Sequence, residues 1–114
     1  GLEAILVGSM TAAAEYGVEA RVLASLKETW PAMDWEKLAG YMIERVVSHG
    51  KRRAAEMREV AATLEGIGLE PIMAAASAAR QQWVADLGVK ERLGGRKTED
   101  RAMLVRAIRE AMGK

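Results

Sequence analysis

Apolar residues recur at intervals of three or four along most of the chain, and glycine or proline interrupts this pattern at several points. Such spacing is typical of amphipathic helices, whereas strands alternate every second residue. The pattern predicts an all-α fold, a single bundle of about six helices without strands. The predicted helices cover residues 2–16, 19–29, 35–49, 51–65, 70–87 and 98–114.

Residues of particular types stand where these helices begin and end. Short polar residues cap helix N-termini, proline fits the first turn, and glycine adopts the left-handed conformation that ends a helix. We therefore expect Asp34 and Thr98 to cap helix N-termini and Pro71 to lie in a first turn. Three glycines are expected to end helices, namely Gly17, Gly50 and Gly88.

The apolar stripes predict which side chains face the core. The first helix is small or apolar on every side, so it is predicted to pack on all sides and to need a second subunit. The expected inward residues of the fourth helix are Ala54, Met57, Val60, Ala61 and Leu64, and those of the fifth are Ile72, Ala75, Ala76, Ala79, Trp83 and Leu87. The last helix has a narrow seam of Met103, Leu104, Ala107, Ile108 and Met112.

Three regions follow from these patterns. Residues 1–87 are expected to form the helical core, and the glycine-rich, charged residues 88–97 an exposed linker. Residues 98–114 are expected to form a C-terminal helix that docks on another subunit. The chain begins with Gly1 inside an apolar run, without a preceding cap, so we expect it to be part of a longer protein.

Composition agrees with one helical domain and excludes several kinds of site. Half of the 114 residues are hydrophobic, only 4% are aromatic, and there is no Phe. Without cysteine there is no disulfide framework or thiolate metal site, and a single histidine excludes most histidine metal clusters. We therefore expect no metal site and a cytoplasmic location.

The net charge of +1 does not require a polyanionic partner. The longest uncharged run, residues 4–14, contains Gly8, Ser9 and Thr11 and is too short to span a bilayer. Residues 13–26 have a helix-turn-helix spacing, but the exposed face of the second helix is neutral and poorly suited to DNA phosphates. We therefore expect neither membrane nor nucleic acid as a partner.

The candidate site residues lie around Gly50. His49 is either a ligand-binding group or a cap for the last carbonyls of the predicted third helix. Lys51, Arg52 and Arg53 open the predicted fourth helix, where free N–H groups attract a phosphate or carboxylate. The alternative is a solvated basic turn in which Arg52 pairs with Glu56. No nucleophile and base stand together, so we predict no catalytic residue in this chain.

The run from His49 to Val60, HGKRRAAEMREV, and the run from Leu69 to Met73, LEPIM, resemble a known family. They are similar to the C-terminal helical domain of 6-phosphogluconate dehydrogenase-like NAD(P)-dependent oxidoreductases, which include 3-hydroxyisobutyrate dehydrogenases. The opening residues 1–4 and the turn at residues 16–19 fit as well. The resemblance covers about residues 1–87 and is more specific for the family than for a substrate.

The resemblance implies a two-domain parent protein. An N-terminal Rossmann domain would bind NAD or NADP, and this helical domain would complete the substrate cleft and form a homodimer. The family's catalytic lysine would lie upstream of Gly1, so the chain alone is expected to be inactive and to bind no cofactor. His49, Arg52 and Arg53 fall near a segment that lines the cleft in relatives, although Arg53 replaces a residue that is acidic in many of them.

Two functions from different classes remain open on these grounds. One is the substrate-binding and dimerisation domain of a dehydrogenase that acts on a hydroxy acid or a similar small anionic alcohol. The other is a stand-alone helical protein-interaction module without an enzymatic parent. A nucleotide-binding motif encoded upstream of Gly1 would distinguish them.

Overall fold

A computed structural model describes all residues from 1 to 114 and contains six helices and no strand. The helices are α1 (Leu2–Glu15), α2 (Glu19–Thr29), α3 (Trp35–Gly66), α4 (Ile72–Leu87), α5 (Val89–Arg92) and α6 (Arg101–Ala111). The prediction of an all-α fold is confirmed. The number of helices also agrees, but the helices are divided differently along the chain.

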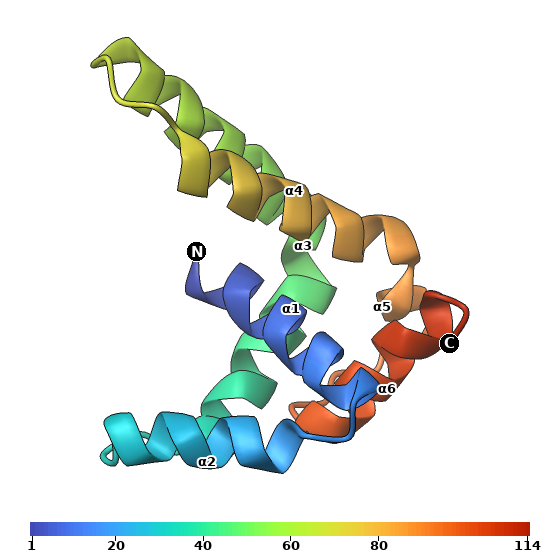
Figure 1. Cartoon of the computed structure of the whole chain (residues 1–114). Coiled ribbons are helices and arrows are strands. Elements are labelled where there is room, and N and C mark those ends of the chain that lie inside the picture. The colour runs from blue at the N-terminus through green and yellow to red at the C-terminus, as the bar shows by residue number, and fades with distance from the viewer.

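Helix α3 is the longest element, and the other helices pack around it (Figure 1). Its first half lies against α1, α2 and α6, and its second half pairs with α4, which runs back alongside it. The end of α3 and the beginning of α4 project from the rest of the molecule. The radius of gyration is 14.6 Å, above the value of about 13 Å expected for a compact domain of this size.

Gly50 does not end a helix, so the predicted boundary between residues 35–49 and 51–65 is wrong. The helix continues through this position, and Gly50 does not have the positive φ of a helix-ending glycine. A Cβ atom at Gly50 would lie 2.8 Å from the backbone oxygen of Gln81. The glycine therefore allows α4 to approach α3 closely.

Several other predicted boundaries are confirmed. The Asp34 side chain accepts a hydrogen bond of 3.2 Å from the Lys37 backbone N–H at the start of α3. Gly17 and Gly88 follow α1 and α4 with positive φ values of 65° and 69°. Both angles lie in the left-handed region that glycine adopts without strain.

The last two predicted helix starts are shifted. Asp100, rather than Thr98, caps α6, since its carboxylate accepts a hydrogen bond of 3.1 Å from the Met103 backbone N–H. Pro71 precedes the first residue of α4 instead of forming its first turn.

The core lies between α1, the first half of α3 and α6. Its largest fully buried side chains include Met10, Ile43, Leu104 and Ile108. Helix α6 therefore turns Leu104, Ala107 and Ile108 of its predicted seam towards its own chain. The segment 88–97 contains the short helix α5, whose Val89 is buried in the same core.

The predicted inward stripe of α4 is correct for Trp83 and Leu87, which pack against the core, and wrong for its other four members. Ile72, Ala75, Ala76 and Ala79 are exposed, and the buried residues are Ala74, Ser77, Ala78, Gln81 and Val84. Alanine is common on both sides of this helix, so the sequence offers little contrast between its faces. The face with small residues packs on α3 because it permits the closest approach.

One partly buried ion-pair cluster joins three helices. The Arg101 guanidinium at the start of α6 binds the Glu36 carboxylate of α3 and lies 3.7 Å from that of Glu19 in α2. The hydrogen bond that Arg101 donates to Glu36 is the main reason why the pKa of Arg101 is raised. The sequence patterns did not predict the contact of Arg101 with Glu36 and Glu19, because these residues lie far apart in the chain.

A Cβ atom at Gly40 would overlap the backbone oxygen of Glu99, immediately before α6. We expect Gly40→Ala to lower the free energy of unfolding by about 1–3 kcal/mol, because the segment before α6 must move. Gly66→Ala is the control, since no atom lies within 4 Å of its added Cβ; its effect should stay within about 0.5 kcal/mol. Urea unfolding of both variants measures the difference, and equal stability would contradict this packing.

Candidate functional site

The structure brings the three predicted site residues to one side of α3. His49, Arg52 and Arg53 are spaced at i, i+3 and i+4, so they lie on neighbouring turns of the same face. Arg52 is exposed and its Nε lies 3.7 Å from the Glu56 carboxylate, which is the surface pair expected as the alternative. The Nε of Arg53 is buried without a hydrogen-bond partner.

The physical argument for an anion at Lys51, Arg52 and Arg53 is wrong. It required a helix N-terminus with free N–H groups, but these residues lie within α3, where the backbone is hydrogen-bonded. His49 is likewise far from a helix end and caps no terminal carbonyls. A role of these residues in substrate binding therefore depends on their side chains alone.

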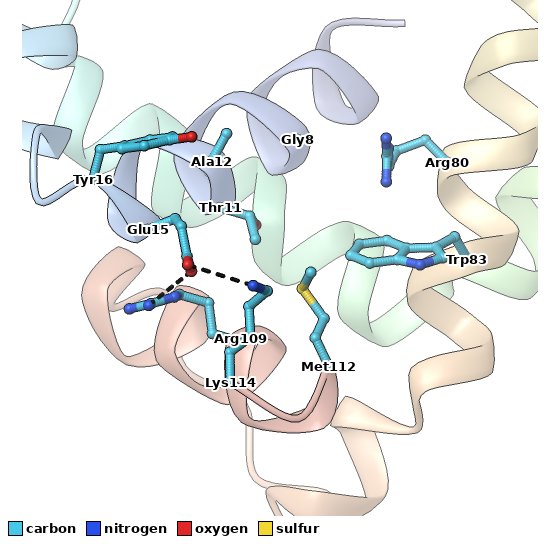
Figure 2. Close-up of a pocket in the computed structure, with 10 residues that line it drawn as sticks. All are labelled: Gly8, Thr11, Ala12, Glu15, Tyr16, Arg80, Trp83, Arg109, Met112 and Lys114. Carbon is cyan, nitrogen blue, oxygen red and sulfur yellow. Dashed lines mark hydrogen bonds and ion pairs between the residues drawn. The ribbon is translucent and has the colours of Figure 1, made fainter.

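A separate pocket of about 260 Å³ opens between α1, α4 and the C-terminal residues that begin in α6 (Figure 2). Its lining residues are Gly8, Thr11, Ala12, Glu15, Tyr16, Arg80, Trp83, Arg109, Met112 and Lys114. None of the three predicted site residues belongs to it. The sequence patterns missed this pocket because its walls come from three segments far apart in the chain.

Positive charge predominates in this pocket. Glu15 accepts hydrogen bonds from Arg109 at 3.0 Å and from Lys114 at 3.4 Å. These contacts, the one from Arg109 above all, hold the pKa of Glu15 below its ordinary value of 4.5. The Arg80 guanidinium lies over the Trp83 ring, 4.7 Å from its centroid. Cations on aromatic faces are attracted by the ring's quadrupole.

An apolar groove of about 540 Å³ lies between α1, α2 and the start of α3. Trp30 and Trp35 stand at this groove with ring centroids 5.9 Å apart. The Trp35 indole N–H donates to the Trp30 backbone oxygen at 3.2 Å. Leu2 and Ile5 of α1 also line the groove and remain exposed, so α1 is not covered on all sides within this chain.

The structure has no group of three or more acidic or histidine side chains that could hold a metal ion. None of its helices combines the length and the apolar character needed to cross a membrane.

Comparison with known proteins identifies the family. Residues 13–84, more than half of the chain, match the domain of unknown function DUF1932. The chain belongs to the DUF1932 family. DUF1932 is the C-terminal helical domain found in 3-hydroxyisobutyrate/6-phosphogluconate dehydrogenase-like proteins, so the resemblance of the sequence is supported at this broad level.

The DUF1932 chain also resembles a solved structure, described as a conserved hypothetical protein from Sinorhizobium meliloti 1021. The two share 31% sequence identity with a TM-score of 0.82 over 96% of this chain. The chain spans only 36% of that protein's length. No curated protein matches the chain.

The lowered pKa of Glu15 has a consequence for stability. A carboxylate with a lowered native pKa stabilises the folded chain above its ordinary value of 4.5. This contribution is lost as the pH falls through the native pKa. We expect Glu15→Gln to lower the melting temperature at neutral pH, and the difference from the wild type to vanish in acid.

Thermal unfolding followed by circular dichroism over a pH series tests this expectation. Glu110→Gln is the matched control, because Glu110 is an exposed carboxylate on the same helix as Arg109 and makes no ion pair. A difference between Glu15→Gln and the wild type that persists unchanged in acid would contradict the role of the ion pair.

Proposed function

We propose that the chain is the substrate-binding and dimerisation domain of an NAD(P)-dependent oxidoreductase that acts on a hydroxy acid or a similar small anionic alcohol. Membership of DUF1932, a domain of dehydrogenase-like proteins, carries this proposal. The similar protein from Sinorhizobium meliloti is much longer than this chain, which leaves room for a separate nucleotide-binding domain. In this arrangement the protein works in the cytoplasm.

The cofactor belongs to the other domain in this proposal. A Rossmann site places the pyrophosphate at a glycine-rich turn between a strand and a helix. This chain contains helices only, so its residues do not fit such a site. NAD or NADP would be bound mainly by an N-terminal domain. The catalytic lysine would follow that domain and precede Gly1.

His49, Arg52 and Arg53 remain our candidates for contact with the anionic substrate. They share one face of α3, and the buried Nε of Arg53 lacks a hydrogen-bond partner. A buried donor without a partner is costly, and hydrogen bonds between a guanidinium and a carboxylate are among the strongest in proteins. A substrate carboxylate would satisfy this donor.

Dimerisation is supported by the projecting α3–α4 arm, which we define as residues 55–79. Its tip exposes four large apolar side chains, Ile67, Leu69, Ile72 and Met73, by 55–74%. Clustered apolar side chains at a projecting tip are typical of protein interfaces. A second copy of the chain would cover them, and it would also cover Leu2 and Ile5 on α1.

The division between domains predicts that the isolated chain binds neither NAD nor NADP. Isothermal titration calorimetry with each cofactor should show no heat of binding, whereas the intact parent should bind one of them. Cofactor binding by the chain alone would contradict the proposal. So would a gene without a nucleotide-binding motif upstream of Gly1, and that result would favour the stand-alone interaction module.

The proposed dimer predicts that the chain sediments as a dimer at micromolar concentration. Replacement of Ile72 and Met73 together by Glu should convert it to a monomer, because each buried charge opposes association. Met103→Glu is the control, since Met103 is also a large apolar residue, 48% exposed, but lies on α6, away from the arm. A monomeric wild type, or dissociation by the control alone, would refute the arm as the interface.

A further inference from the structure

The pocket between α1, α4 and the C-terminal residues has an unbalanced charge. Three cations, Arg80, Arg109 and Lys114, line it together with the single carboxylate of Glu15. Glu15 is shared between Arg109 and Lys114. The pocket therefore retains an excess of positive charge, which favours the entry of an anion.

Arg80 is the cation without an acidic partner. It makes no ion pair with any carboxylate of the chain, and its guanidinium lies over Trp83. A guanidinium has five N–H donors, so one without an acidic partner has donors available for a planar acceptor such as a carboxylate. A second donor, the Nε of Arg109, is buried and has no hydrogen-bond partner.

One wall of the pocket is built from small residues of α1, and the Arg80 side chain reaches it at Gly8. Gly8, Thr11 and Ala12 are spaced at i, i+3 and i+4, so the same side of the helix presents all three to the pocket. The Thr11 hydroxyl donates to the Val7 backbone oxygen at 2.6 Å, which leaves its oxygen able to accept another hydrogen bond. No large side chain from α1 fills the space.

The remaining walls are apolar and flat. Figure 2 shows the Trp83 ring reaching into the pocket from α4, while Met112 lines it from the C-terminal residues. Thioether and aromatic surfaces accommodate an apolar ring. The volume of about 260 Å³ lies just below the usual range of about 300–1,000 Å³ for ligand pockets, and therefore suits only a small molecule.

We propose that this pocket binds a small organic acid with a flat apolar body. Arg80 binds the carboxylate, and the body lies between Trp83 and Met112. Glu15 is the internal competitor, because it occupies two of the cations when the ligand is absent. This site is distinct from His49, Arg52 and Arg53, and its existence does not depend on a dehydrogenase parent.

Benzoate is a suitable probe, with benzamide as its uncharged counterpart of nearly equal shape and inorganic phosphate as an anion without an apolar body. Titrations of the 114-residue chain, followed by amide and indole NMR signals, should show benzoate shifting the signals of Trp83, Gly8 and Met112. Benzamide and phosphate should each bind at least about tenfold more weakly, because each lacks one of the two interactions.

Two substitutions should change benzoate affinity in opposite directions. Arg80→Gln should weaken it about tenfold by removing the free cation. Glu15→Gln should strengthen it by releasing Arg109 and Lys114. Arg92→Gln is the matched control, because Arg92 is an exposed arginine on α5 outside the pocket. Circular dichroism confirms that each variant is folded.

Several results would overturn the proposal. The first is that benzoate shifts only signals elsewhere on the chain, and the second is that it binds no better than benzamide. The third is that Arg80→Gln behaves like the Arg92→Gln control. Failure of cofactor binding by the parent protein would refute the proposed dehydrogenase function but would leave these titrations unaffected, so the two proposals are tested separately.

Discussion

The fold depends on two places where the backbone of α3 touches another segment directly. At Gly50 the nearest atom to an added Cβ is the backbone oxygen of Gln81 in α4, and at Gly40 it is that of Glu99 before α6. Any side chain at either position would push these segments away. Because both glycines lie on one continuous helix, they fix α4 and α6 relative to the same axis. The core of Met10, Ile43, Leu104 and Ile108 closes around this arrangement.

The close packing of α3 and α4 also explains the shape of the molecule. Only the first half of α3 is surrounded by α1, α2 and α6, so the paired ends of α3 and α4 extend beyond the core (Figure 1). The small buried face of α4 leaves its larger apolar residues, Ile72 and Met73, on the outside. A structure that buries its small residues and exposes its large ones at an arm is suited to contact with a second molecule.

Two arginines illustrate how burial and pairing separate structural from ligand-binding cations. Arg101 is buried and paired with Glu36 and Glu19, so it joins α6 to α2 and α3. Arg80 is exposed, stacks on Trp83 and has no carboxylate partner. In the sequence alone, each is an arginine within a predicted helix, and nothing distinguishes one from the other. Their different roles arise from the residues that the fold places beside them, which is why the second pocket has no local sequence signature.

Local physical chemistry was enough to predict the helical class, the cap at Asp34 and the glycine turns at Gly17 and Gly88, and a resemblance of sequence runs indicated the family. These features depend on neighbours within a few residues, or on runs of sequence that are shared between relatives. The tertiary structure alone decided that α3 continues through Gly50, which face of α4 is buried, and that Glu15, Arg80 and Arg109 meet at one pocket. A glycine in a sequence indicates a helix stop and a close helix contact equally well, and only the packing partner, here Gln81, distinguishes them.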